Sequence, residues 1–554
     1  MRHQSILRTG PSDPVRAESR FGNRIIIVLF PGQGRRRPIG SNCETLDTIP
    51  ESFLTPDSYA AIGFKSGLEV HRQLLTGRKL FCHCPPGLYS HRVDAQAFRH
   101  MRPTLSEMGE YDGTALMEFK TKKDILYQLD ERTICTYELD DTPPFPPDRE
   151  AIDIALMQAM LVGCSLVGEI HIIRKQYLDG SIPTGFQRTF LVGVDGKLPV
   201  GDREVELTQI SLEEDSCREV ADVGHLRTYR ADRLGMPITE FVTGPAFRTP
   251  DEVAEGARAI QALARVTPVR RGIGTARQDV NVSVAGGTRV EIKGVPRIPL
   301  IPRLTHFEAV RQKRLLMLRD RLRDDGVGTP EIDGARVHMR GWRGLLDWPI
   351  GPGMTFLDEL RGRVRVIACV QDDDSLRLVG DETIEVHGPE RDLATAVEEI
   401  AMRAGEALEG IPSETRQALR DGTTRFERIL PGPDRMYPDT DMPPIPVTPA
   451  RIDEIRQRLP EPSWERIAKA RAFGVSGGLA SLVAVSPRWP LFEDALDRGV
   501  KGTLAASLLV EEARCLERRG VRLDRIDWLG ILTDGMPKKE WRGALLAAAA
   551  EAER

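Results

Sequence analysis

Alternating polar and apolar residues between Arg277 and Val284 constrain the fold of this chain more than any other feature. Valine occupies positions 280, 282 and 284, and polar residues occupy the positions between them. Successive side chains of a β-strand point to opposite faces, so the segment predicts a strand with one polar face. That face carries Arg277, Asp279, Asn281 and Ser283. Functional polar faces have this pattern, and exposed sheet faces have it as well.

Two kinds of segment indicate a large α/β or α+β body over residues 57–335, which we expect residues 424–447 to complete. The strand-like segments include residues 205–212 and 290–293, and the amphipathic helices include residues 152–166 and 250–266. Thr249 is suited to cap the second helix, and Pro250 stands at its first position, where a missing N–H costs nothing. The start of this helix is therefore well marked.

The pattern changes twice after residue 335. Residues 336–423 predict a small inserted α+β domain, with strands at residues 364–370 and 376–379, an acidic turn at residues 371–374 and a helix at residues 392–408. Residues 448–554 have a helical pattern almost throughout, most clearly at residues 511–519 and 538–553. Residues 1–56 are rich in Arg, Gly, Pro and Ser without a sustained period, which predicts a disordered extension.

The length and net charge of the chain limit its number of domains and its affinity for nucleic acid. Hydrophobic cores stop growing near roughly 250–300 residues, so a chain of 554 residues predicts three or four domains. The net charge of −5 argues against a general affinity for nucleic acid, so that any RNA contact must use a local patch. Phe307 to Leu322 predicts a long basic helix that is either a packed connector with a solvated basic face or such a contact.

No segment of the sequence has the length of a membrane span. The aliphatic run from Ile25 to Phe30 is far shorter than the roughly 20 residues that a bilayer requires. The residues after this run do not resemble the cleavage site of an export signal. The 8 cysteines are scattered rather than arranged as a disulfide framework, which favours a reducing compartment. We therefore expect a cytoplasmic protein with no membrane partner.

No Walker-type Gly-Lys-Ser/Thr loop occurs, so a standard phosphate-binding loop is absent. The candidate chemistry lies instead in two acidic motifs. Glu69 and His71 are two residues apart in a strand-like segment, so both side chains point to one face and are able to share a divalent cation. A surface ion pair is the alternative for such a pair. Glu213, Glu214 and Asp215 follow the strand at residues 205–212, where they repel one another unless a cation or a basic partner neutralises them. A solvated turn is the alternative there.

Several motifs in a fixed order resemble the B/E family of glutamyl-tRNA(Gln) amidotransferase subunits, in its archaeal-type E form. The motifs lie within residues 58–480, and they are Gly67–Leu74, Lys79–Pro85, Arg102–Glu110, Asp179–Thr189, Ile273–Ser283, Arg289–Val295 and Arg435–Ile445. The resemblance implies an α+β (α/β) catalytic cradle domain with a small insert like that of aspartyl-tRNA synthetase and an α-helical C-terminal bundle.

The resemblance also implies an activity. Such a protein phosphorylates the γ-carboxylate of misacylated Glu-tRNA(Gln) with ATP and Mg²⁺ and then admits ammonia, which converts Glu-tRNA(Gln) to Gln-tRNA(Gln). An asparaginase-like partner, the D subunit of the amidotransferase, supplies the ammonia, so a hetero-oligomer is expected. ATP is required because a carboxylate is a poor acyl donor, whereas an acyl phosphate carries a good leaving group.

Residue roles follow from the same resemblance. The implied catalytic residues are Glu69, His71, Glu213, Glu214 and Asp279. Magnesium would be held by Glu69, His71, Glu214 and Glu240, with Glu213 and Asp215 near that shell. Nucleotide or substrate would be bound by Lys175, Arg188, Arg277, Asn281 and Lys293. A structural zinc ion would be held by Cys82, Cys84 and Cys135, although a lone Cys-x-Cys pair is a weak zinc signal and packed cysteines are the alternative.

Three departures from the family pattern keep alternatives open. The insert is short, with about 70 residues between Trp348 and Thr423, the helical tail is trimmed after Ala548, and the N-terminal extension has no counterpart. One alternative is a specialised relative that activates another carboxylate or aminoacyl-tRNA in a biosynthetic pathway. Another is a non-catalytic scaffold that binds tRNA or a partner. The retained acidic residues argue against the scaffold, because a binding module has no need of them.

Overall fold

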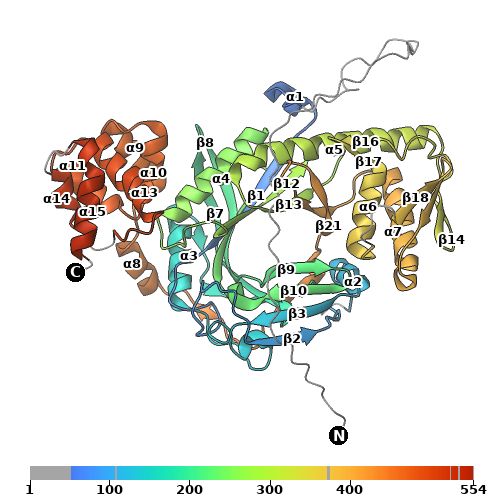
Figure 1. Ribbon diagram of the computed structural model, residues 1–554, viewed down its shortest axis with the longest axis horizontal. Helices are drawn as coiled ribbons and strands as arrows, with labels where there is room; N and C mark the ends of the chain where they lie inside the picture. Colours follow the sequence, from blue (N-terminus) through green and yellow to red (C-terminus); the bar gives the residue numbers. More distant parts are fainter. Residues whose placement is uncertain (1–51, 107–108, 371–374, 524–525, 534–536, 553–554) are drawn as a thin grey trace, which may run out of the picture. The chain divides into compact units, whose positions relative to one another are not determined.

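The computed structural model describes residues 52–106, 109–370, 375–523, 526–533 and 537–552 (Figure 1). Almost all of the extension predicted at residues 1–56 lies outside these ranges, as does the acidic turn predicted at residues 371–374. The chain from Pro50 onward forms one compact unit. None of the described helices combines the length and the apolar character that a membrane crossing needs.

A mixed sheet of eleven strands forms the centre of this unit. Its strands in spatial order are β21 (Thr424–Ile429), β20 (Glu414–Ala418), β13 (Val290–Val295), β12 (Ala276–Ser283), β1 (Lys65–Gln73), β11 (Pro237–Thr243), β8 (Arg203–Glu214), β7 (Phe186–Val200), β6 (Ile173–Gln176) and β22 (Met436–Pro438), with β4 (Ser165–Leu166) paired to β7. The predicted strands at residues 205–212, 277–284 and 290–293 are confirmed as β8, β12 and β13.

The two faces of this sheet differ in chemistry. Leu68 and Val70 of β1 and Val280 and Val282 of β12 are buried in the main core, on the face that contacts the helices α3 (Arg149–Leu161), α4 (Pro250–Arg265) and α5 (Ile301–Asp324). In Figure 1, α4 and α5 run along one side of β1 and β12. The alternate residues of the same strands are polar and form the other face. Burial of the apolar face thus fixes the register of the polar one.

A second sheet of four strands belongs to the same body. Its order is β2 (Ala95–Arg99), β3 (Asp124–Leu129), β10 (Leu226–Arg230) and β9 (Arg218–Val223), with β3 and β10 parallel. Its buried side chains form a separate core that includes Ile125, Tyr127 and Tyr229. Short elements complete this part: α1 (Pro56–Ala61), α2 (Gly113–Lys120), the 3-10 turn η1 (Tyr137–Leu139), and β5 (Glu169–Ile170) paired with β23 (Ile445–Pro446).

The long helix α5 joins the main core to a second one. Its Leu304 and Ala309 pack in the main core, whereas Leu318 and Leu322 pack with α6 (Phe356–Ile367) and α7 (Glu390–Glu409). This second core also covers a small sheet whose order is β14 (Glu331–Asp333), β15 (Arg336–His338), β19 (Thr383–Val386) and β18 (Leu376–Val379), next to the hairpin of β16 (Pro349–Gly351) and β17 (Met354–Thr355). Of the two interpretations of residues 307–322, the packed connector is the one that the buried residues of α5 favour.

The strand predicted at residues 364–370 is wrong. Residues 356–367 form α6, which starts with a capping box between Thr355 and Asp358. Leu360 and Val364 lie four residues apart and are both buried on one side of this helix, so helical packing overrides the β-propensity of the valines. The predictions at residues 376–379 and 392–408 are confirmed by β18 and α7.

Two boundaries also differ from the prediction. The helix predicted at residues 152–166 is α3, which ends at Leu161, and residues 165–166 turn back as β4 against β7. β20 falls in the range predicted for the insert, but it pairs with β13 in the large sheet. The helix predicted to begin at Pro250 is confirmed, and the Thr249 hydroxyl accepts a hydrogen bond from the backbone N–H of Glu252.

The last part of the unit is helical. Its elements are α8 (Pro449–Gln457), α9 (Ser463–Ala472), α10 (Gly477–Ala484), α11 (Trp489–Asp497), α12 (Gly502–Ala506), the π turn η6 (Ser507–Glu512), α13 (Ala513–Glu517), α14 (Trp528–Thr533) and α15 (Trp541–Ala552). Trp489, Phe492 and Trp541 are buried in its own core. The mixed fold with a helical C-terminal segment agrees with the predicted fold class.

Candidate functional site

A small polar cavity lies on the polar face of the large sheet. Its volume is ≈120 Å³. Charged side chains of seven strands converge on it. The strands β1, β6, β8, β11, β12 and β13 supply Glu69, His71, Lys175, Glu213, Glu240, Asp279, Glu291 and Lys293, and β21 supplies Arg428. Because period 2 places alternate residues of each strand on one face, strands from distant parts of the sequence bring these charges together here.

One group of ligand atoms surrounds His71. Its Nε2 lies 3.3 Å from Oε1 of Glu213 and 3.4 Å from Oε1 of Glu240, and Nζ of Lys175 donates to Oε2 of Glu213 at 3.0 Å. Burial lowers the pKa of His71, but its hydrogen bonds to the two carboxylates hold that pKa well above its usual value. Burial raises the pKa of Glu213, but Lys175 and His71 bring it below its usual range. Glu213 is therefore an ionised, buried carboxylate.

A second group consists of Glu69, Asp279 and Glu291, whose nearest carboxylate oxygens lie within 4.8 Å of one another. Glu69 and Asp279 are register partners on β1 and β12. Nδ2 of Asn281 donates to Oε1 of Glu69 at 3.1 Å, and the backbone N–H of Gly294 donates to Oδ1 of Asp279 at 2.7 Å. Burial first, and then the charge of Glu291, raise the pKa of Glu69 to about 7. The three carboxylates repel one another and favour a cation between them.

Glu214 and Arg188 lie apart from both groups. Oε2 of Glu214 accepts a hydrogen bond from the Tyr137 hydroxyl at 3.0 Å, and its Oε1 accepts one from the backbone N–H of Arg188 at 2.9 Å. The Arg188 guanidinium binds Asp439 at 2.7 Å and Asp441 at 3.1 Å. Glu214 follows Glu213 directly in β8, so its side chain points to the opposite face of the sheet. Glu213 occupies the position beside His71 and Glu240 that the resemblance implied for Glu214.

Arg277 and Asp215 form an ion pair beside the cavity rather than in its lining. Nη2 of Arg277 lies 2.6 Å from Oδ1 of Asp215, and Gln73 donates to Oδ2 of the same carboxylate at 3.1 Å. The three acids that sequence reasoning weighed as a solvated turn are all buried, with exposed fractions of 2% for Glu213 and Glu214 and 1% for Asp215. Each has a basic or hydroxyl partner, which the sequence did not reveal.

Sequence reasoning missed several residues of the cavity. Glu291, Arg289, Arg428 and Arg435 line it, together with Tyr177. A signal for Glu291 was present, since it is two residues before Lys293 in the same strand and therefore shares its face. No such signal exists for Arg428 and Arg435. The order of the strands in the sheet brings β21 and the turn before β22 to the cavity, and that order is not a local feature of the sequence.

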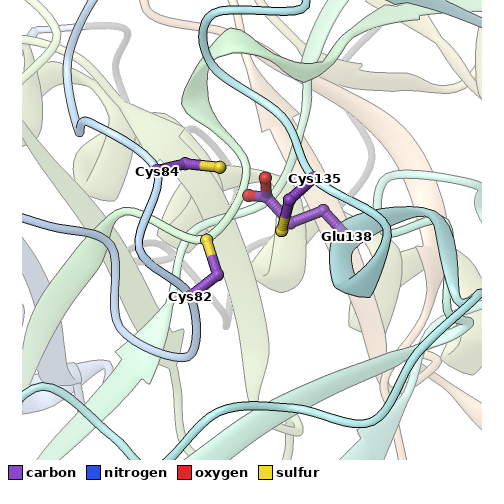
Figure 2. A group of neighbouring side chains, drawn as sticks. All are labelled: Cys82, Cys84, Cys135 and Glu138. Carbon is purple, nitrogen blue, oxygen red and sulfur yellow. The ribbon is translucent and has the colours of Figure 1, made fainter.

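Three cysteines and a glutamate converge at a second place (Figure 2). The side chains of Cys82, Cys84, Cys135 and Glu138 point toward one another, and their ligand atoms lie within 4.8 Å of each other. Glu138 accepts a hydrogen bond from Nζ of the buried Lys79 through Oε1 at 2.6 Å, whereas its buried Oε2 has no hydrogen-bond partner within the described structure. The set of three sulfur atoms and one free carboxylate oxygen fits a tetrahedral zinc ion.

The residues of the polar cavity fit a hard divalent cation beside a phosphate. Carboxylate oxygens with one imidazole fit Mg²⁺, which is usually bound through one or two carboxylates and completes its shell with water and substrate phosphate. His71, Glu213 and Glu240 would hold it, and the ion would neutralise phosphate charge there. Lys175, Lys293 and the arginines supply the cations that anionic substrate groups require.

A family model and several known proteins are similar in sequence to this chain. The model of the GatB/GatE catalytic domain matches residues 64–453. The glutamyl-tRNA(Gln) amidotransferase E subunit of Methanopyrus kandleri is 38% identical over 84% of this chain and 81% of its own length. The proteins of the same name from Methanocaldococcus jannaschii and Thermococcus gammatolerans are 36% and 37% identical over 85% and 83% of this chain, and over 82% and 81% of their own lengths. Both the domain match and the extent of identity establish that this chain belongs to the GatB/GatE catalytic-domain family.

Proposed function

We propose that this chain is the component of a glutamyl-tRNA(Gln) amidotransferase that activates the glutamate of Glu-tRNA(Gln) for transamidation. The observation that carries the proposal is the convergence of His71, Glu213 and Glu240 with Lys175 in one polar cavity of a chain of this family. ATP and Mg²⁺ are the cofactors that this chemistry requires. The relatives are named as E subunits of an amidotransferase, so the chain acts within an enzyme of several different chains.

The activation step is a phosphoryl transfer. An oxygen of the glutamate γ-carboxylate attacks the γ-phosphorus of ATP, and ADP leaves with the electron pair of the broken P–O bond. Lys175 and Lys293 line the cavity, and in this proposal they hold phosphate or carboxylate oxygens in line. Positioning of the reactants and stabilisation of charge account for most of the catalysis of phosphoryl transfer. Asp279 and Asn281 orient the nucleotide or the incoming ammonia from β12.

The amidation step consumes the acyl phosphate. Ammonia attacks the acyl carbon, phosphate leaves, and the nitrogen loses a proton, which gives Gln-tRNA(Gln). An asparaginase-like partner, the D subunit, would release the ammonia, so the working enzyme in this proposal is a hetero-oligomer. Its expected location is the cytoplasm. Arg188 and Glu214 contribute by fixing the segment at Asp439 and Asp441 to the cradle, rather than by touching the cation.

An assay with free ammonia tests the activation step without the partner. With ATP, Mg²⁺, an ammonium salt and Glu-tRNA(Gln), the full chain is expected to form ADP and Gln-tRNA(Gln) in equal amounts. Replacing ammonia by hydroxylamine should trap the acyl phosphate as a hydroxamate. Deacylated tRNA(Gln) is the matched control, and it should support neither product. A folded protein that forms neither ADP nor amide from Glu-tRNA(Gln) would refute the proposal, whereas ADP formation with another carboxylate would favour a specialised relative.

We also propose that Cys82, Cys84, Cys135 and Glu138 hold a structural zinc ion. Cys135 and Glu138 flank Tyr137, the residue whose hydroxyl binds Glu214. A closed site of four protein ligands stabilises the segments that supply them, because binding energy is then folding energy. The zinc ion would thus hold η1 and the segment after β1 in one arrangement.

Metal analysis of the purified protein is expected to give about one zinc ion per chain, as for a closed structural site. Cys84→Ser should lower the zinc content and the unfolding temperature, because one of the four ligands is lost. Cys164→Ser is the matched control, since Cys164 is also half-buried but lies outside the group. Zinc-free wild-type protein of full activity would contradict the assignment.

A further inference from the structure

A large cavity lies on the opposite face of the strands that carry the catalytic residues. Its volume is ≈1480 Å³. Arg72 of β1 and Ala276 and Gln278 of β12 line it, whereas His71 and Asp279 of the same strands line the polar cavity. Neighbouring residues of one strand thus serve two separate sites. The rest of the lining comes from α4, from the loops around residues 271–274 and 296–300, and from α10, η6 and α13.

Positive charge dominates the lining of this cavity. Eight of the described lining residues are arginines, and the one acid among them is Glu517, which is paired with Arg488. Six of the arginines belong to the sheet, α4 and their loops, and they are Arg72, Arg258, Arg265, Arg271, Arg297 and Arg420. Among the residues that the structure describes, no carboxylate oxygen approaches any of these six within the 4.0 Å of an ion pair. The cluster therefore lacks counter-charges of its own.

Arg72 is a buried residue of the cluster whose positive charge is not balanced by an acidic neighbour among the described residues. Its side chain is buried, with 2% of the residue exposed, and one of its guanidinium N–H groups donates to the backbone carbonyl of Arg270. Its Nε has no hydrogen-bond partner in the described structure, and neither has Nε of Arg265. Burial and then the charges of Arg265 and Arg271 lower the pKa of Arg72 to about 9. A buried guanidinium with an unpaired N–H and no counter-charge is costly unless a ligand supplies an acceptor.

We propose that this cavity, which we call the arginine cavity, is a phosphate-binding site for the RNA backbone, distinct from the catalytic cavity. Guanidinium groups bind phosphate through paired N–H donors, and six arginines without a carboxylate partner in the described structure match several phosphates of one ligand. No aromatic side chain occurs in the described lining, so the recognition is of phosphates and not of stacked bases.

The size of the cavity favours a polymer over a free nucleotide. Pockets for drug-sized ligands have about 300–1,000 Å³, which is less than the ≈1480 Å³ found here. The inference rests on the proposed function in one respect, because the RNA is then the tRNA substrate. A strand that enters this cavity lies on the far side of the sheet from the reacting carboxylate, so it contributes to tRNA affinity and not to the chemical step.

The test is a salt titration of tRNA binding. The double variant Arg258→Gln/Arg271→Gln removes two exposed charges of the cavity, and Arg149→Gln/Lys197→Gln removes two exposed charges elsewhere. The dissociation constant of Glu-tRNA(Gln) for the full chain is measured between 50 and 200 mM salt. Loss of two phosphate contacts should reduce the slope of log K against log salt by about 1.4–1.8 and weaken binding about tenfold or more at low salt. The control variant should behave as wild type.

Further measurements separate the sources of phosphate. Amidation at saturating Glu-tRNA(Gln) should keep the wild-type kcat in the double variant. If the wild type and the double variant are both inactive, the result contradicts the proposed function and not the assignment of the cavity. If inorganic triphosphate binding falls but tRNA binding does not, the cavity takes a free polyphosphate, and the RNA assignment is overturned. If neither changes, the phosphate site is refuted. Loss of association with the partner chain alone would overturn it in favour of an acidic protein surface.

Discussion

Glu213→Gln is expected to lower kcat for Gln-tRNA(Gln) formation about 100- to 1,000-fold, the usual effect of removing one electrostatic contact to a transition state. Glu213 lies 3.3 Å from His71 and 3.0 Å from Lys175, so under the proposed function its charge holds both the cation site and a lysine that would bind phosphate. The amide keeps the shape of the side chain but removes that charge. The Mg²⁺ concentration for half-maximal rate should rise at least about tenfold. Initial rates over a Mg²⁺ titration measure both effects.

Glu214→Gln is the matched control, because it makes the same change in the adjacent residue. Its carboxylate binds Tyr137 and Arg188 on the opposite face of β8. Burial raises the pKa of Glu214, whereas that of Glu213 is lowered by its basic partners despite burial. We expect the Mg²⁺ dependence of this variant to match the wild type even if its kcat falls. An equal shift of the Mg²⁺ dependence in the two variants would show that Glu214 is a ligand, as the resemblance implied.

Arg416→Ala is expected to destabilise the protein by about 3–5 kcal/mol, which is the usual effect of breaking a buried ion pair from one side. The Arg416 side chain is fully buried in β20 and lies 2.6 Å from Glu414 and 3.1 Å from Glu359 of α6. Arg311 of α5 binds the same two glutamates. Removing Arg416 leaves carboxylates with too few cations at the junction of the large sheet and the second core. Urea unfolding followed by circular dichroism measures the loss.

A surface pair provides the control for this variant. Arg336 binds Glu385 at 2.9 Å, but the Arg336 side chain is 53% exposed. Arg336→Ala is expected to change stability by less than about 1 kcal/mol, since exposed pairs contribute little. If the two variants unfolded at the same urea concentration, the buried network would not hold the junction together.

Much of the cradle could be predicted because alternation and capping are local signals. The polar face of β12 and the pairing of Glu69 with His71 on one side of β1 both follow from a period of two. The burial of Glu213 and Asp215 could not be predicted, because their partners Lys175 and Arg277 are distant in sequence. The strand expected at residues 364–370 fails for the same reason, since the packing of Leu360 and Val364 against α7 decides it.

Both outer edges of the large sheet are formed late in translation. β20 and β21 close one edge and β22 the other, although their neighbours β13 and β6 were synthesised more than a hundred residues earlier. Arg428 and Arg435 line the polar cavity from these late segments. A nascent chain that has completed α7 at Glu409 therefore carries both groups of candidate cation ligands, around His71 and around Glu69, but lacks these two arginines. Products truncated there thus retain the candidate metal ligands while lacking part of the cavity wall.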